Sequence, residues 1–163
     1  MSWNNKIKNK YYSDRNKLAE QVAEWKQSSQ KIVFTNGCFD ILHLGHLDYL
    51  SKAADLGDKL IIGVNTDKSV QQLKGPYRPV IDEDTRALKL ASLAYVDAVI
   101  LFNEETPLEL IKSLSPDVLV KGGDYTIETV VGADHVLRNG GEVKLIEFLP
   151  GHSTSSIIER IQK

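Results

Sequence analysis

Residues 31–46 read KIVFTNGCFDILHLGH and contain both the first β-strand and the first functional signal of the chain. The apolar, β-branched run 31–34 leads into a turn that contains Gly37, and a helix-like segment begins near Leu44. A strand that passes through a glycine-containing turn into a helix is the setting in which backbone amides bind phosphate. This order predicts an opening β–turn–α unit with an anion site at the turn.

Two histidines in this segment, His43 and His46, stand three positions apart with Gly45 between them. A helix start or a tight turn would place both imidazoles on one side. Gly45 has no Cβ, which lets an anionic ligand approach the backbone closely. We therefore interpret residues 35–46 as a clamp for a nucleoside triphosphate.

The same histidine spacing also occurs in metal half-sites and in polar surface patches. No cluster of Cys, Asp or Glu elsewhere in the sequence has the spacing that would complete a zinc site. The acidic residue Asp40 and the glycine turn before the pair are more typical of an anion site. We predict no metal ligand from the protein.

Length and composition predict a single domain with its own core. A chain of 163 residues can bury roughly two thirds of its unfolded surface. Its net charge of −2 gives no overall basic surface, which argues against nucleic-acid binding. We divide the chain into an N-terminal arm and helix, residues 1–29, and one domain, residues 30–163.

The sequence also favours a cytoplasmic protein. Cys38 is the single cysteine and cannot form an internal disulfide, and residues 1–10 lack the apolar stretch of a signal peptide. No segment approaches the ~20 apolar residues needed to cross a bilayer. We expect Cys38 to be a small turn residue packed behind the site, without chemistry of its own.

Five β-rich segments alternate with helix-length segments: 31–35, 59–64, 97–102, 117–120 and 142–146. They read as continuous Val, Ile and Leu, which is typical of strands buried on both faces of a parallel sheet. We predict a Rossmann-like, doubly wound α/β domain with a five-stranded parallel sheet. Ligands bind such sheets beyond the strands' carboxyl ends, where the winding reverses.

Helix positions follow from local signals. Residues 1–12 are polar and predict a frayed or loosely docked arm, and a stripe of Leu18, Val22 and Trp25 predicts a helix that packs on the domain. Arg86 falls on a helix and could merely pair with Asp82 or Glu83. The boundary signals are Asp82 and Thr106-Pro107 for starts, 139–141 for a stop, and Ser156 with Glu159 for a capping box.

From residue 30 to residue 162 the chain resembles the nucleotidyltransferase superfamily marked by an HxGH motif. Within it the chain is most similar to the D-glycero-β-D-manno-heptose 1-phosphate adenylyltransferase domain, which is often fused to a sugar kinase. Five segments carry the resemblance, in the same order as in the family: TNGCFDILHLGH at 35–46, VNTDKSVQQLKGPYRPV at 64–80, VKGGDY at 120–125, NGGEV at 139–143 and STSSIIERIQ at 153–162. Five matching segments in order are more specific than the HxGH motif alone.

The resemblance implies transfer of AMP from ATP to a sugar 1-phosphate, with release of pyrophosphate. The sugar-phosphate oxygen would attack the α-phosphorus directly, without a covalent enzyme intermediate, so the protein would position the reactants and stabilise charge. His43, His46 and Lys121 are the implied catalytic residues, the histidines as donors to α- and β-phosphate oxygens. Mg²⁺ would arrive with ATP and keep most of its waters.

The resemblance implies further binding residues. Those for the nucleotide lie in the turn, the HxGH segment and the start of the last helix: Thr35, Asn36, Gly37, Phe39, Asp40, Gly45, Ser153, Thr154 and Ser155. Those for the acceptor follow the second and fourth strands: Lys74, Arg78, Gly122, Gly123 and Asp124. Asp124 could accept hydrogen bonds from sugar hydroxyls.

Several of these residues have a purely structural alternative. Asp40 could order its own turn through an Asx-type bond. Lys74 and Lys121 could be solvated surface lysines, residues 122–124 a plain turn, and residues 153–156 the cap of a helix. The larger aromatic residues are expected in the core or at an interface: Trp25, Phe39, Tyr49 and Phe148.

The sequence is also compatible with other functions. The closest rival is a cytidylyltransferase for glycerol 3-phosphate or another small phosphorylated alcohol. Cytidylyltransferases of this superfamily carry an Arg-Thr pair where this chain has residues 149–152, LPGH, which favours ATP over CTP. A regulatory module that binds nucleotide without turnover is a third possibility, whereas a class I aminoacyl-tRNA synthetase would need an anticodon-binding domain. A homo-oligomer could form through a sheet edge or through the helix that carries Trp25.

Overall fold

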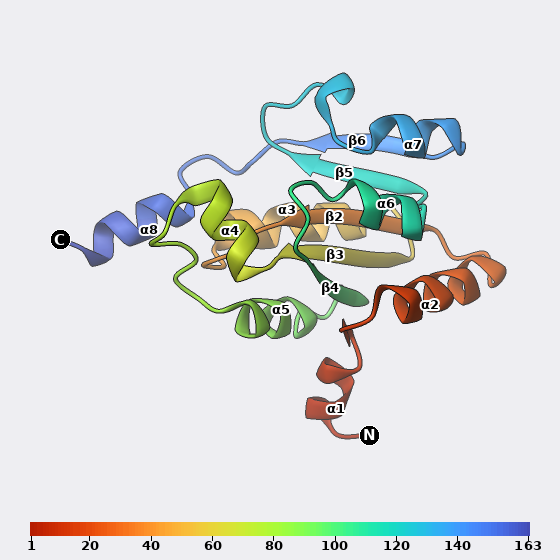
Figure 1. The fold of residues 1–163 in the computed structure, drawn as a ribbon, viewed down its shortest axis with the longest axis horizontal. Helices are drawn as coiled ribbons and strands as arrows, with labels where there is room; N and C mark the ends of the chain where they lie inside the picture. Colours follow the sequence, from red (N-terminus) through yellow and green to blue (C-terminus); the bar gives the residue numbers. More distant parts are fainter.

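The first predicted strand lies in the interior of a six-stranded parallel sheet (Figure 1). A computed structural model describes all residues, 1–163, and gives the strand order β1-β4-β3-β2-β5-β6. Every pairing between neighbours is parallel. The predicted doubly wound α/β class is confirmed, but the predicted number of strands is wrong because β1 was missed.

The strands are β1 Tyr11–Tyr12, β2 Ile32–Gly37, β3 Lys59–Asn65, β4 Ala98–Phe102, β5 Val118–Gly122 and β6 Glu142–Ile146. The helices are α1 Trp3–Lys8, α2 Arg15–Gln27, α3 Leu44–Ala54, α4 Asp67–Lys74, α5 Glu83–Ala91, α6 Leu108–Leu114, α7 Ala133–Arg138 and α8 Thr154–Ile161, with a 3₁₀ turn η1 at Ile127–Thr129.

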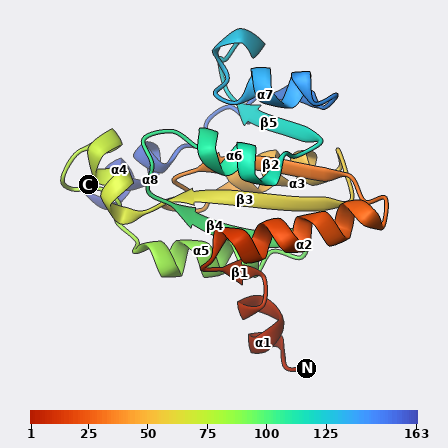
Figure 2. The same cartoon turned by 45° about the vertical axis from the view of Figure 1, so that its right-hand side comes forward.

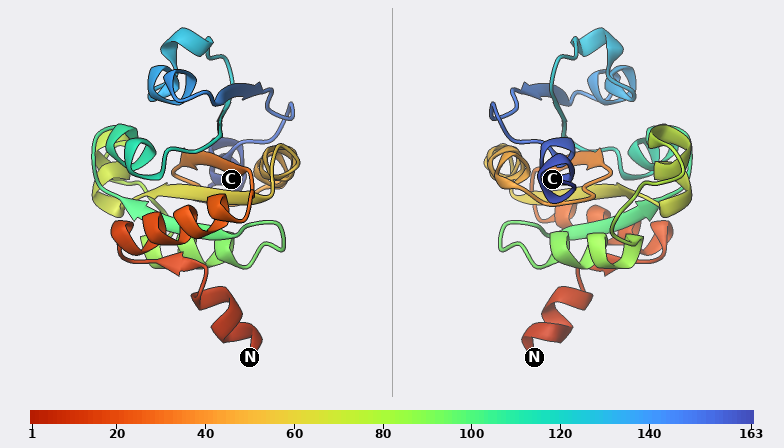
Figure 3. Two further views of the ribbon diagram at one scale, coloured as in Figure 1. Left: turned by 90° about the vertical axis from the view of Figure 1, so that its right-hand side faces the viewer. Right: turned by 90° about the vertical axis from the view of Figure 1, so that its left-hand side faces the viewer.

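Alternating residues of the strands form two cores, one on each face of the sheet. Phe34 of β2 packs with residues of α2, α6 and α7, whereas its neighbour Val33 packs with residues of α3 and α5. Figure 3 shows α3 and α6 on opposite sides of the sheet. This burial on both faces accounts for the continuous apolar strands, because each successive side chain meets a helix layer.

The winding of the sheet reverses at β2. The chain runs from β2 through β3 to β4 in one direction, and then returns to place β5 on the other side of β2. The carboxyl ends of β2 and β5 therefore flank the position at which doubly wound sheets bind ligands. This confirms the predicted switch point between the turn at residues 35–40 and the end of the fourth predicted strand.

The N-terminal arm is not frayed, which corrects the prediction for residues 1–12. Residues 11–12 form β1, which pairs with β4 at the edge of the sheet. The Tyr11 hydroxyl donates to Asp84 over 2.7 Å, and burial and that hydrogen bond to Asp84 raise the pKa of Tyr11. Only α1 projects beyond this edge (Figure 2). A two-residue strand has no periodicity by which the sequence could reveal it.

Two of the predicted helix caps are wrong and two are confirmed. Asp82 caps α5 by accepting from the Thr85 amide, and α7 ends at Arg138 with Asn139 as its C-cap. However, α6 begins after Pro107 without a side-chain cap. The cap of α8 is Ser153, which accepts from the Ser156 amide, so the proposed capping box of Ser156 and Glu159 is not the one that forms.

Candidate active site

A cavity of about 240 Å³ opens at the switch point between β2 and β5. Its walls come from the turn after β2, from α3, from the end of α4, from the end of β5 and from residues that lead into α8. Nine of the predicted site residues line it: Asn36, Gly37, Phe39, Asp40, His46, Lys74, Lys121, Gly122 and Thr154. The fold thus brings together residues that are up to 118 positions apart, from Asn36 to Thr154.

The two histidines stack face to face at the start of α3. The centroids of the His43 and His46 rings are 3.8 Å apart, with 24° between their planes. Gly45 makes this possible, because a Cβ at that position would lie 3.0 Å from the His43 ring. The Nδ1 atoms of both histidines are buried and have no hydrogen-bond partner. Unpaired buried nitrogens of this kind are costly and rare in folded proteins.

The surroundings keep both imidazoles neutral near pH 7. Burial and the nearby charges of His43 and Lys74 lower the pKa of His46 to about 4. Burial, followed by the charge of His152, also lowers the pKa of His43. A neutral imidazole in or beside a cavity that also contains Lys74 and Lys121 can donate an N–H group to an anion. An incoming polyphosphate would also offset the positive charge of Lys74.

Lys121 lines the cavity from the end of β5. Burial lowers the pKa of its ammonium group, and its Nζ lies 5.3 Å from the centre of the Tyr125 ring. A smaller hollow of about 80 Å³ is also lined by Asn36, Lys121 and Tyr125. Lys121 is therefore shared between two neighbouring cavities and is not a freely solvated surface lysine.

Asp40 does not simply order its own turn, which corrects the structural alternative considered for it. Its carboxylate accepts from the Arg78 guanidinium at 2.7 Å and from the amides of Val80 and Ile81. Burial would raise the pKa of Asp40, but these amide hydrogen bonds and Arg78 hold it below its usual value. Asp40 thus fixes the loop that follows Lys74 against the turn after β2.

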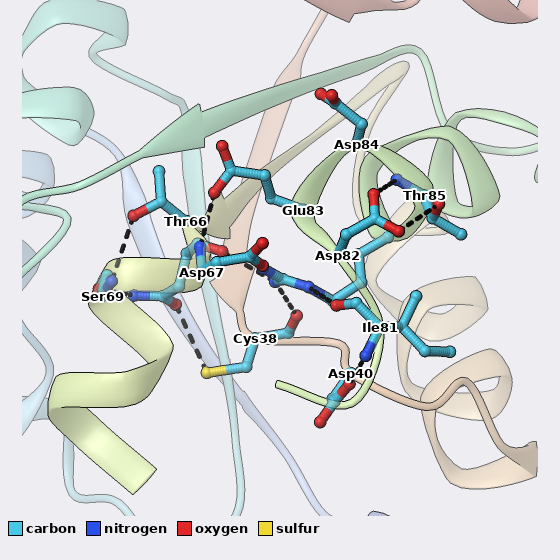
Figure 4. Close-up of polar contacts among 12 residues, drawn as sticks. Cys38, Asp40, Thr66, Asp67, Ser69, Ile81, Asp82, Glu83, Asp84 and Thr85 are labelled. Carbon is cyan, nitrogen blue, oxygen red and sulfur yellow. Dashed lines mark hydrogen bonds and ion pairs between the residues drawn. The ribbon is translucent and has the colours of Figure 1, made fainter. Parts of the chain in front are cut away.

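Arg86 has a larger role than the expected pairing with Asp82 or Glu83. Its side chain is fully buried and donates to the carbonyls of Cys38, Asn65 and Ile81 and to the Asp67 carboxylate. Figure 4 shows this network, in which Cys38, Asp67 and Ile81 converge from three segments. Arg86 therefore ties together the ends of β2 and β3 and the start of α5.

Other predicted residues lie outside the cavity wall. The Thr35 side chain is fully buried and its hydroxyl hydrogen-bonds to the Tyr49 hydroxyl over 2.6 Å, so its hydroxyl is not free to bind phosphate. Asp124 is exposed and lines neither cavity. Six further predicted residues do not line the cavity: His43, Gly45, Arg78, Gly123, Ser153 and Ser155.

The family model for cytidylyltransferase-like proteins matches residues 34–160, which include the whole of this cavity. The chain belongs to the cytidylyltransferase-like family. It is 56% identical over 144 residues to the bifunctional protein HldE of Citrifermentans bemidjiense, covering 88% of this chain and 30% of the relative. It is 57% identical over 143 residues to the bifunctional protein HldE of Marinomonas sp., with the same coverage of 88% and 30%. The chain thus spans about 30% of the length of these curated relatives.

Two solved structures share the fold of this chain. A lipopolysaccharide core biosynthesis protein from Thermoplasma volcanium is 31% identical, with a TM-score of 0.59, and the match covers 74% of this chain and 97% of that chain. A pantoate-beta-alanine ligase from Francisella tularensis shares the fold, with a TM-score of 0.56 over 93% of this chain and 76% of that chain, at 12% identity.

Four residues that line the cavity of this cytidylyltransferase-like chain were not predicted as site residues: Cys38, Tyr49, Tyr125 and Phe148. Tyr49 and Phe148 were expected in the core or at an interface, but Phe148 is 57% exposed. The prediction that Cys38 packs behind the site is wrong, because it lines the cavity itself. Only the position of Tyr125, directly after the segment 121–124, gave a local signal.

The side chains of the protein do not form a metal-binding cluster. No group of three or more His, Cys, Asp or Glu side chains is arranged to hold a metal ion. Asp40 is the one carboxylate in the cavity wall, and both of its oxygens accept hydrogen bonds from the protein.

None of the helices combines the length and apolar character that crossing a membrane requires.

Proposed function

We propose that this chain transfers AMP from ATP to a sugar 1-phosphate, D-glycero-β-D-manno-heptose 1-phosphate, and releases pyrophosphate. The observation that carries the proposal is that His46 and Lys121 line one cavity at the switch point, with His43 stacked behind His46. The identity of 51–57% to HldE proteins supports the same class of reaction. A product such as ADP-heptose, used for surface polysaccharide, agrees with the name of the Thermoplasma volcanium relative, a lipopolysaccharide core biosynthesis protein.

The donor site follows from the arrangement of the cavity. In our proposal, His43 and His46 donate to α- and β-phosphate oxygens, and Lys74, at the end of α4, faces the leaving pyrophosphate. Thr154 lies at the start of α8, where free backbone amides favour a phosphate. The stacked histidines are held against each other before the reaction, so they would stabilise the developing charge with little reorganisation.

The acceptor site is the smaller hollow beside Lys121. Its wall contains the polar side chains of Asn36, Lys121, Tyr125 and Thr129. A sugar phosphate held there would approach the α-phosphorus from the side opposite to the leaving group, as direct displacement requires. One phosphate oxygen of the acceptor forms the new bond to the α-phosphorus while the bond to the bridging oxygen of pyrophosphate breaks. Lys121 would contact both reactants as a point charge.

Mg²⁺ forms part of this proposal as a companion of ATP. Triphosphate oxygens and water can supply its octahedral shell, and the hydrogen-bonded Asp40 is not free to serve as a ligand. The ion would neutralise charge on the triphosphate. We place the reaction in the cytoplasm, as the single cysteine suggested, and a homo-oligomer stays a prediction.

Product analysis tests the proposal. The protein is incubated with Mg²⁺ and either ATP or CTP, against a panel of sugar 1-phosphates and glycerol 3-phosphate, and the products are identified by mass spectrometry. ADP-heptose and pyrophosphate from ATP are the expected products. A CDP-linked product would assign the cytidylyltransferase function instead, and binding of ATP without turnover on any acceptor would assign the regulatory one.

A further inference from the structure

Phe148 is an aromatic residue that the mechanism above does not use. It lies between β6 and α8, is 57% exposed, and lines the same cavity as Lys121. Its ring meets Tyr49 edge-on, with centroids 5.9 Å apart and 64° between the planes. An exposed phenylalanine in the wall of a polar cavity costs hydration free energy, which a flat apolar ligand would recover.

Two glycines, Gly122 and Gly123, leave the space that the Phe148 ring occupies. A Cβ at Gly122 would lie 2.4 Å from Phe148 Cε1, and a Cβ at Gly123 would lie 2.8 Å from its Cε2. Gly123 also has a φ of +94°, which other residues rarely adopt. Its amide donates to the Ile146 carbonyl over 3.2 Å, which ties the segment before Phe148 to β5. Only glycines at both positions let the ring lie this close to the end of β5.

We propose that Phe148 is the base-binding residue of the nucleotide site and stacks against adenine. This inference rests on the proposed function, because it takes a nucleoside triphosphate as the ligand. The cavity wall contains His46, Lys74 and Thr154, to which we assign the phosphates, and it also contains Phe148, which packs edge-on against Tyr49. A ligand that carries both a triphosphate and an aromatic ring matches both kinds of group.

The same contact gives a physical basis for preferring ATP. A purine presents two fused rings and covers more of a phenyl face than a pyrimidine does, so removing Phe148 removes more affinity from ATP than from CTP. Stacking of a base on an aromatic side chain is broadly sequence-tolerant, so the preference arises from contact area and not from hydrogen bonds. Phe148 is thus a specificity-determining residue and not a catalytic one.

Calorimetric titration tests the inference with two ligands, ATP and inorganic tripolyphosphate, on the full chain. Phe148→Ala should weaken ATP binding roughly 10-fold and leave tripolyphosphate binding unchanged. Phe148→Trp, which keeps an aromatic face, should retain most of the affinity for ATP. Trp3→Ala serves as the control, because Trp3 is 76% exposed on α1, far from the cavity in the fold, and should alter neither affinity.

The outcomes separate this inference from the proposed function. Unchanged ATP affinity in Phe148→Ala would overturn the stacking role, and so would an equal loss for ATP and tripolyphosphate, which would indicate a purely structural effect. His46→Ala should weaken the binding of both ATP and tripolyphosphate, because both ligands carry the phosphates that His46 contacts. If Phe148→Ala loses ATP selectively while no sugar 1-phosphate is ever adenylylated, the base site stands and the proposed reaction fails.

Discussion

The rings of His43 and His46 stack at 3.8 Å, although the two residues belong to different structural contexts. His43 is the extended residue that precedes α3, and His46 lies within the first turn of that helix. Their unpaired Nδ1 atoms and the lowered pKa values of both rings describe a pair of neutral donors held in place before any ligand arrives. Such preorganisation is how a site without covalent chemistry can accelerate a displacement.

His43→Ala should keep the fold and lower turnover ~100-fold or more, because one donor to the transition state is removed. The side chain makes no capping hydrogen bond to α3, so little stability depends on it. Steady-state pyrophosphate release measures the effect. The matched control is His135→Ala, since His135 hydrogen-bonds to Ser115 outside the cavity and its loss should leave turnover intact. Normal turnover in His43→Ala would remove His43 from the mechanism.

Because the pKa of His46 is lowered in the folded protein, the free energy of unfolding should decrease as the pH falls from about 6.5 to about 4. In the folded protein its pKa is about 4, whereas in the unfolded chain it takes its ordinary value. Between these pH values the unfolded state binds the extra proton, so the free energy of unfolding rises with pH across this window. Urea denaturation at several pH values should show a shallower dependence in His46→Gln than in the parent protein. Equal slopes would contradict the lowered pKa.

Asp40→Asn should destabilise the protein by ~3–5 kcal/mol, because it leaves the buried Arg78 guanidinium without its charged partner. The side chains are only 1% and 17% exposed, respectively. Chemical denaturation of the single variants and of the double variant Asp40→Asn/Arg78→Gln measures the coupling. The double variant should be less destabilised than the sum of the single variants. Additive losses would show that the pair does not hold the 78–81 loop.

Deletion of residues 1–12 should lower the melting temperature, since it removes β1 from β4 and the Tyr11–Asp84 hydrogen bond. Tyr11→Phe alone should cost about 0.5–1.5 kcal/mol. Substitution of the exposed Lys8 to Ala serves as the control, because Lys8 lies on α1 and contributes no buried contact. If the deletion leaves the melting temperature unchanged, the arm is only loosely docked, as the sequence predicted.

The strands of the fold were largely predictable because each interior strand is apolar on both faces. The range 59–64 was predicted for β3, which spans Lys59–Asn65. The edge strand β6 was also predicted at its observed bounds, 142–146, although Val143 is its one buried residue. β1 was not predictable, because its two residues gain their pairing only from the edge of β4. The strand β1 forms because it pairs with β4, which is distant in the sequence.

Within the site, the sequence could indicate residues that stand in turns after strands, but not their partners. Nothing local to Asp40 reveals Arg78, which lies 38 positions later. Thr35 was expected to face the ligand because it adjoins the turn, yet its side chain points into the core toward Tyr49. Phe148 follows the end of β6 by two residues but belongs to no motif, so its place in the cavity became evident only from the contacts of its ring with Gly122 and Gly123.

The most direct test of the central claim is a crystal structure of this protein with an ATP analogue whose α,β-bridging oxygen is replaced by a methylene group. We expect α- and β-phosphate oxygens within ~3 Å of ring nitrogens of His43 and His46, and Lys121 Nζ beside the α-phosphate. A triphosphate bound away from those rings, with the base in their place, would contradict it.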